Sequence, residues 1–125
     1  MKVLTDTHTL VWALTEPEKL GRAARRALDT SPFTASVANL WELVWKKRKP
    51  GALLSDPIPW WDRYVARSEI PTLALRVAHI EALAALPDYH QDPFDRILLA
   101  QAAAENLTLV SCDKQLAQYG VRVIW

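Results

Sequence analysis

The stretch HQDPFDRILLAQAAAEN, residues 90–106, combines two kinds of pattern. Its second half has the apolar spacing of an amphipathic helix, and Pro93 stands where that helix is predicted to begin. Two carboxylates, Asp92 and Asp95, lie on either side of this start. An acid before a first-turn proline, with a second acid three residues on, is typical of a helix cap. We therefore expect a helix over Pro93–Glu105 whose first acids either cap it or carry chemistry.

Strands and helices are predicted to alternate along the rest of the chain. Apolar or β-rich runs predict five strands, at Lys2–Thr5, Pro32–Val37, Ile70–Leu75, Leu107–Cys112 and Val121–Trp125. Apolar spacing predicts further helices, at His8–Glu16, Gly21–Asp29, Ala38–Lys49, Trp60–Ser68, Val77–Leu86 and Lys114–Gly120, with a loop at Leu53–Pro59. In the helix at Val77–Leu86, one face collects Val77, Ile80, Leu83 and Ala84.

The fold class follows from this alternation. The first, second and fourth strands are continuous apolar runs without a period of two, which favours a parallel sheet covered on both faces. No internal repeat or linker interrupts the 125 residues. The sequence therefore predicts a single α/β domain over residues 1–125, a three-layer α/β/α sandwich with a mainly parallel sheet.

Composition excludes several classes of function. The net charge of +1 gives no strong general attraction to nucleic acid or membrane. Cys112 is the one cysteine, expected to be a small buried thiol, so neither a disulfide nor a cysteine zinc site is predicted. Three glycines cannot form a phosphate-binding loop, and neither H-E-x-x-H nor G-x-S-x-G occurs. The first residues make a poor signal peptide and no apolar run reaches membrane-span length, so a cytoplasmic location without membrane contact is expected.

Carboxylates are the groups left for chemistry, and they map to one edge of the predicted sheet. If every helix runs antiparallel to the strands, strand carboxyl ends and helix amino ends share an edge, where open α/β sheets bind ligands. Asp6 ends the first strand and Asp113 the fourth, while Asp92 and Asp95 open the helix between. Glu42 lies about one turn into the helix after the second strand.

Two interpretations of these acids are possible. Asp6, Asp92 and Asp113 are each natural helix caps. Glu42, however, stands among Leu and Trp residues in NLWELVW, where a carboxylate is expected to be partly buried and to need a partner. Several carboxylates at one edge also repel, and a divalent cation relieves that cost. A cluster of acids without Lys or Arg fits Mg²⁺- or Mn²⁺-assisted phosphodiester hydrolysis, so the opening acids are predicted to cap and coordinate at once.

At these residues the sequence resembles a known family. The start DTHTLVW, the mid-chain LWEL, the segment HQDPFDRILLAQA and the late LVSCD resemble PIN-domain ribonucleases over essentially the whole chain. The resemblance is to the VapC-type toxins of toxin–antitoxin pairs, in the branch with an H-x-D-P-F-D-R motif. It implies a PIN α/β/α sandwich and a Mg²⁺- or Mn²⁺-dependent endoribonuclease.

The resemblance also implies site residues and partners. The family's metal-binding and catalytic acids correspond to Asp6, Glu42, Asp95 and Asp113. Asp92, the subgroup's additional acid, is expected to cap the helix or to support the ligands. Three supporting groups are expected near the site, namely Thr7, Arg96 and Ser111. The implied partners are an RNA substrate, a cognate antitoxin that reaches into the acidic site, and a second copy of the chain in a homodimer.

The tryptophans and the basic run KKRK can each be interpreted structurally or functionally. The pair Trp41 and Trp45 is most simply core, although some of the six tryptophans could line a partner groove. The run KKRK, Lys46–Lys49, is most simply a solvated helix end, expected toward the edge opposite the acids. Its sharper interpretation is an RNA-backbone contact, together with Arg22, Arg25 and Arg26. His90 is expected to hydrogen-bond the helix that follows it.

Two alternative functions stay open on the sequence. A phosphoaspartate receiver or phosphohydrolase would show neighbouring acids after the first strand and a lysine after the last one. Here TDTH offers a single acid and the last predicted strand runs to Trp125. A non-catalytic PIN-like interaction module, whose acids are only caps, is the second alternative. The presence of all four acid positions argues against it.

Overall fold

A five-stranded sheet forms the centre of the molecule in the computed structural model, which describes residues 2–90 and 92–125. The strand order is β3-β2-β1-β4-β5, and every pair is parallel. The strands are β1 (Val3–Thr5), β2 (Phe33–Ser36), β3 (Thr72–Leu73), β4 (Thr108–Val110) and β5 (Val123–Ile124). The predicted parallel α/β fold is thus confirmed, with strands at all five predicted places.

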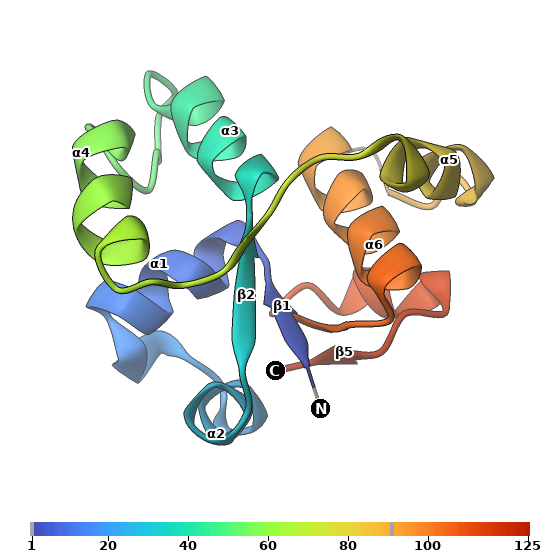
Figure 1. Cartoon of the computed structure of the whole chain (residues 1–125), viewed down its shortest axis with the longest axis horizontal. Coiled ribbons are helices and arrows are strands. Elements are labelled where there is room, and N and C mark those ends of the chain that lie inside the picture. Colours follow the sequence, from blue (N-terminus) through green and yellow to red (C-terminus); the bar gives the residue numbers. More distant parts are fainter. Residues whose placement is uncertain (1, 91) are drawn as a thin grey trace.

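Helices connect the strands and cover both faces of the sheet (Figure 1). The α-helices are α1 (Thr7–Thr15), α2 (Arg22–Thr30), α3 (Val37–Lys46), α4 (Pro57–Trp61), α5 (Val77–Ala85) and α6 (Pro93–Glu105). Two 3₁₀ segments, η1 (Pro17–Lys19) and η3 (Lys114–Tyr119), and one π-helical segment, η2 (Asp62–Ala66), complete the described elements. No helix in the described part of the chain combines the length and apolar character needed to cross a membrane.

Three buried clusters define the layers of the fold. On one face, Leu4 and Leu109 of the sheet pack with Leu98 and other residues of α6, and Leu83 of α5 joins their rim. On the other face, Val3 packs with the alanines of α2, and a third cluster joins α1, β2 and η2. Because neighbouring strand residues point to opposite faces, both faces are apolar, which explains the continuous runs in the sequence.

The order of the strands reverses between β1 and β4. From β1 the chain adds β2 and β3 on one side, and then β4 and β5 on the other. The connections after β1 and β4 therefore leave the sheet in opposite directions, and a crevice forms at their carboxyl ends. Asp6 follows β1 directly, and Asp113 lies three residues beyond the last residue of β4.

The helix α3 departs from the predicted arrangement. It continues upward from the end of β2 and stands above the edge of the sheet, instead of folding back against it (Figure 1). There it packs between α1, α4 and α6. The expectation that every helix runs antiparallel to the strands is wrong for α3, and the carboxyl end of α3 lies near the acids. The helix α2, with its arginines, lies at the other end of the sheet (Figure 1).

Other local predictions also need correction. Of the predicted apolar face of α5, Val77 and Ile80 are exposed, and the buried side is formed by His79 with Leu83. The helix α4 begins at Pro57, inside the predicted loop, because proline suits the first turn of a helix. The tryptophans of α3 are not core, since Trp41 is 52% and Trp45 63% exposed.

A buried hydrogen-bond network fixes the start of α3. Ser36 caps the helix by accepting from the Ala38 N–H at 3.0 Å, and Asn39 Oδ1 accepts from the Ser36 N–H at 2.8 Å. Asn39 Nδ2 also donates to Thr5 O at 3.3 Å and to Thr7 Oγ1 at 3.1 Å. This fully buried amide therefore ties the first turn of α3 to the carboxyl end of β1.

Replacing this amide is expected to destabilise the protein. Asn39→Ala removes three hydrogen bonds and leaves buried polar groups without partners, which typically costs about 1–3 kcal/mol for such a group. Thermal and urea unfolding measure the effect, with Gln118→Ala, at an exposed amide of η3, as the matched control. Equal stability of the two variants would contradict the role given to Asn39.

Candidate metal-binding active site

Five carboxylates line one cavity at the switch point between β1 and β4. They are Asp6, Glu42, Asp92, Asp95 and Asp113. The same cavity is lined by His8, Trp12, Lys46 and Cys112. All four acids singled out in the sequence therefore come together, as does the additional acid of the subgroup motif. They arrive from β1, α3, α6 and the segment after β4.

Three of these acids cap helices with one oxygen. Asp6 Oδ1 accepts from the Thr9 N–H at 2.9 Å, and Asp113 Oδ1 from the Gln115 N–H at 3.0 Å. Asp92 Oδ1 accepts from the Phe94 N–H at 2.8 Å. In Asp92 and Asp113 the other oxygen, Oδ2, faces a charged or ring nitrogen in the cavity. The predicted caps are thus confirmed, and a cap leaves a second oxygen for the site.

Glu42 is held rigidly although it is almost fully buried. Its side chain is 8% exposed, and Thr7 Oγ1 donates to Oε1 at 2.6 Å. Because Thr7 in turn accepts from Asn39, the carboxylate is oriented by the network at the start of α3. The partner that a buried carboxylate at this position requires is therefore Thr7 on one side and a cation on the other.

That cation is Lys46, one turn further along α3. Its Nζ lies 2.7 Å from Glu42 Oε2 and 3.1 Å from Asp92 Oδ2. The prediction that the acid cluster contains no lysine is wrong. The prediction that Lys46 lies toward the sheet edge opposite the acids is also wrong. Both errors have one cause, since α3 stands above the acids instead of turning away. The i, i+4 spacing of Glu42 and Lys46 is the signal that sequence reasoning overlooked.

The pKa values of the pair follow from this contact. Burial acts to lower the pKa of Lys46, but its hydrogen bonds to Glu42 and Asp92 outweigh burial and raise that pKa. Burial acts to raise the pKa of Asp92, but hydrogen bonds from Lys46 and from the Phe94 N–H outweigh burial and lower that pKa below its usual value. Lys46 and Asp92 are therefore both charged near neutral pH.

His90 bridges the other side of the cavity. Its Nδ1 accepts from the Asp92 N–H at 3.0 Å, as expected for a residue that bonds the start of the next helix. Because Nδ1 is an acceptor, the neutral ring carries its proton on Nε2. Nε2 lies 3.0 Å from Asp113 Oδ2 and 3.6 Å from Asp95 Oδ2. The imidazole therefore donates into the acid cluster.

Asp95 is the acid least compensated by its surroundings. Burial and then the negative charges of Asp92, Glu42 and Asp6 together raise its pKa to about 7, while His90 acts to lower that pKa. A carboxyl group that is neutral up to about pH 7 marks a place where positive charge is missing. This observation fits a divalent cation among the acids.

The donor atoms also suit such a cation. Within the described part of the chain, Asp95 and Asp113 each offer a carboxylate oxygen, and these two oxygens lie within 4.8 Å of each other beside the His90 ring. Carboxylate oxygens are preferred ligands of Mg²⁺ and Mn²⁺. The remaining acids, Asp6 and Glu42, line the same cavity. The residues present therefore fit an oxygen-ligated divalent metal ion.

Of the other two groups expected to support the site, Ser111 contacts one of its acids and Arg96 does not. Ser111 Oγ accepts from the Asp113 N–H at 3.1 Å and so positions that acid. Arg96 instead donates to Pro87 O at 2.8 Å and lies 3.5 Å from Asp88, so it holds the loop before His90. Cys112, expected to be buried, is exposed at the edge of the cavity.

Comparison with known proteins identifies the family to which this chain belongs. A model of the PIN domain matches residues 3–121. The chain belongs to the PIN-domain family.

Individual relatives are similar along the whole chain. Ribonuclease VapC22 of Mycobacterium tuberculosis is 29% identical over 119 residues, covering 94% of this chain and 91% of the relative. In the crystal structure of VapBC2 from Rickettsia felis bound to promoter DNA, one chain superposes with a TM-score of 0.72 at 17% identity, covering 100% of this chain and 99% of that one. A toxin–antitoxin complex from Klebsiella pneumoniae gives a TM-score of 0.65 at 23% identity, covering 98% and 96%.

The raised pKa of Asp95 predicts an unusual pH dependence. Between its ordinary value of 3.8 and about 7, Asp95 binds a proton in the folded protein but not in the unfolded chain. Stability without metal should therefore fall as the pH rises through this range. In EDTA, thermal unfolding should show this fall in the wild type and a smaller one in Asp95→Asn. Identical pH profiles of the two proteins would contradict the assignment.

Proposed function

We propose that this protein is a Mg²⁺- or Mn²⁺-dependent endoribonuclease that acts as the toxin of a toxin–antitoxin pair. The observation that carries the proposal is the cavity of five carboxylates at the switch point, in which burial and neighbouring acids raise the pKa of Asp95 to about 7. Membership of the PIN-domain family and the similarity to Ribonuclease VapC22 support it. The chain over residues 1–125 is then a single PIN domain of the H-x-D-P-F-D-R subgroup.

The proposed metal ligands are Asp6, Glu42, Asp95 and Asp113. When bound, a divalent cation neutralises charge on the phosphodiester and acidifies a water that attacks it. The chain's own groups orient these ligands: Thr7 fixes Glu42, and Ser111 with His90 fixes Asp113. Asp92 acts as a cap and as the partner of Lys46.

Lys46 has a distinct part in this proposal. RNA is a polyanion, and five carboxylates alone would repel its phosphates. Lys46 balances Glu42 and Asp92, and its side chain is 35% exposed, so the ammonium stands between the acids and solvent. It reduces the repulsion that an approaching phosphate meets, before and after a metal ion is bound.

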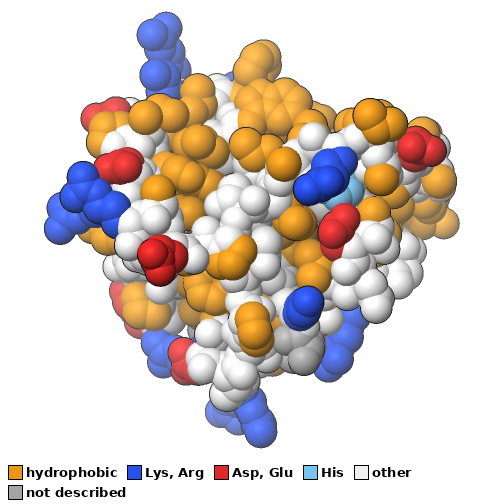
Figure 2. Space-filling view, in the orientation of Figure 1, with side chains coloured by type: hydrophobic (Ala, Val, Ile, Leu, Met, Phe, Trp, Pro, Cys, Tyr) orange, Lys and Arg blue, Asp and Glu red, His pale blue; other side chains and the backbone are white. Residues whose placement is uncertain are grey.

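An antitoxin that reaches into the acidic site also requires a binding surface beside that site. Large apolar side chains are exposed along α3 and α4, at Val37, Trp41, Val44, Trp45 and Ile58. Figure 2 shows hydrophobic side chains gathered over these helices. Interface cores are enriched in such aromatic residues. We assign this face, named the α3–α4 face, to the cognate antitoxin, and we expect a homodimer and a cytoplasmic location, as for other VapC-type toxins.

Loss of a single carboxylate charge should abolish cleavage without unfolding the protein. Asp6→Asn and Asp95→Asn keep side chains of the same shape, and Asn caps a helix about as well as Asp does. With Mn²⁺ or Mg²⁺ and a panel of total RNA, the wild type should cleave, and each variant should be slower by about a hundredfold or more. Gel analysis of the RNA measures cleavage, and thermal unfolding of each variant measures stability.

Glu18→Gln, at an exposed acid of η1, is the matched control and should cleave as the wild type does. Cleavage by Asp95→Asn at the rate of the control would contradict the proposed site. If in addition no divalent metal raised the melting temperature of the wild type, the non-catalytic interaction module would be the better account.

The α3–α4 face predicts where the antitoxin binds. Trp41→Ser and Trp45→Ser should each weaken binding of a cognate antitoxin by about tenfold or more, because large aromatic side chains dominate interface energies. Isothermal titration calorimetry measures the affinity. Val77→Ser, at a side chain of α5 that is 75% exposed, is the control. Unchanged affinity in both tryptophan variants would place the antitoxin elsewhere.

A further inference from the structure

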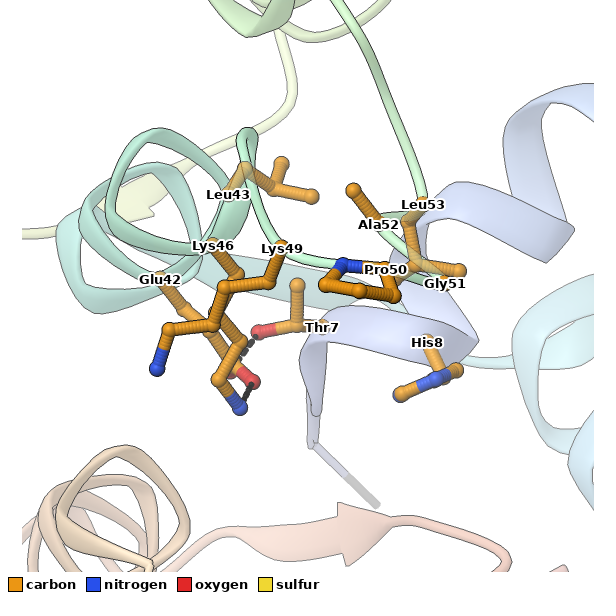
Figure 3. Close-up of a pocket in the computed structure, with 10 residues that line it drawn as sticks. All are labelled: Thr7, His8, Glu42, Leu43, Lys46, Lys49, Pro50, Gly51, Ala52 and Leu53. Carbon is orange, nitrogen blue, oxygen red and sulfur yellow. Dashed lines mark hydrogen bonds and ion pairs between the residues drawn. The ribbon is translucent and has the colours of Figure 1, made fainter.

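A second cavity adjoins the acid site beneath the end of α3. It lies between the start of α1, the last turns of α3 and the segment that follows α3 (Figure 3). Its apolar lining comes from Leu43, Pro50, Ala52 and Leu53. Its volume of about 140 Å³ is well below the ~300–1,000 Å³ of sites for drug-sized molecules. The cavity therefore has room for one ring-sized group.

The two cavities are neighbours and share three of their lining residues. His8, Glu42 and Lys46 line both of them. Figure 3 shows the Glu42 carboxylate and the Lys46 ammonium at one side of the apolar cavity, with the His8 ring at another. A group bound in the apolar cavity would thus lie directly beside the acids.

Two lysines line the apolar cavity. Lys46 and Lys49 both line the cavity, and Lys47 with Arg48 lies between them in the sequence. Figure 3 shows the side chains of Lys46 and Lys49 reaching to the same side, toward Glu42. Lys46 is paired with Glu42 and Asp92, whereas among the described residues Lys49 has no ion pair. Lys49 is exposed and free to bind an external anion.

An apolar slot for one ring beside a free cation matches a nucleotide. Proteins that bind unpaired bases hold them between aromatic or apolar side chains and bind the phosphates with lysine or arginine. We propose that this cavity binds one unpaired base of the RNA next to the cleaved bond, while Lys49 binds a backbone phosphate. The inference rests on the proposed ribonuclease function and adds a subsite that selects single-stranded RNA.

Filling the cavity tests the subsite. The protein carries Asp95→Asn so that RNA is bound but not cut, and the probe is a fluorescein-labelled, mixed-sequence RNA of ten nucleotides with Mg²⁺. Adding Ala52→Phe, which occupies the cavity, should raise the Kd about fivefold or more, the range expected for one stacked base. Adding Ala103→Phe, at an exposed residue of α6, should leave the Kd within about twofold.

The phosphate contact has its own test. Lys49→Gln should make the dependence of log Kd on log salt shallower by about 0.7, the value for one phosphate of a single strand. Lys2→Gln, an exposed lysine at the other end of β1, should leave the slope unchanged. An unchanged slope in Lys49→Gln would remove Lys49 from the subsite.

A measurement on the unaltered chain tests the subsite even if the Ala52→Phe variant does not fold. Methyl NMR of the unaltered chain titrated with the four ribonucleoside monophosphates should show saturable shifts at Ala52 and Leu53. No shift at these methyls, or equal RNA affinity of Ala52→Phe and Ala103→Phe, overturns the subsite. Loss of antitoxin binding with unchanged RNA affinity in Ala52→Phe also overturns it, since the cavity would then serve a protein partner.

Failure of the subsite can be distinguished from failure of the proposed ribonuclease function. If the wild type cleaves RNA and Ala52→Phe in the otherwise unaltered protein cleaves with the same KM, the nuclease is retained and the subsite is rejected. If the wild type neither binds nor cleaves RNA, both are rejected.

Discussion

Repulsion among five carboxylates is the constraint around which this end of the molecule is built. The parallel strand order brings Asp6 and Asp113 to the crevice between β1 and β4, and α6 adds Asp92 and Asp95. In a partly buried cavity such charges must be balanced, or some of the acids must take up protons. Lys46 balances the charges of Glu42 and Asp92, and the His90 ring hydrogen-bonds to Asp113. Asp95 is left with a pKa of about 7, so a further cation bound beside this carboxyl group would relieve the most repulsion.

The helix α3 makes this balance possible. Because it stands above the sheet edge, its inner side carries Glu42 into the cavity and, one turn later, Lys46 to the same carboxylates. Asn39 and Ser36 anchor its start to β1 and β2 through buried hydrogen bonds. Its outer side leaves Trp41 and Trp45 exposed. One helix therefore supplies a ligand, its counter-charge, the wall of the neighbouring cavity and the face proposed for the antitoxin.

Local patterns predicted much of this structure, and the failures share a cause. The alternation of strands and helices, the start of α6 at Pro93 and the caps at Asp6, Asp92 and Asp113 follow from short-range rules and are confirmed. Which way α3 leaves β2 depends on packing against α1, α4 and α6, and no local pattern specifies it. The misplaced Lys46 and the tryptophans mistaken for core both follow from that one unpredicted direction.

The central claim, that these carboxylates hold a catalytic metal ion, is tested most directly by diffraction. Crystals of the wild type soaked in Mn²⁺ would be measured at the manganese absorption edge, where the anomalous signal locates the ion. The account predicts a manganese peak within coordination distance of a carboxylate oxygen of Asp95 and of at least one further acid of the cavity. A fully soaked crystal with no manganese at these acids would contradict it.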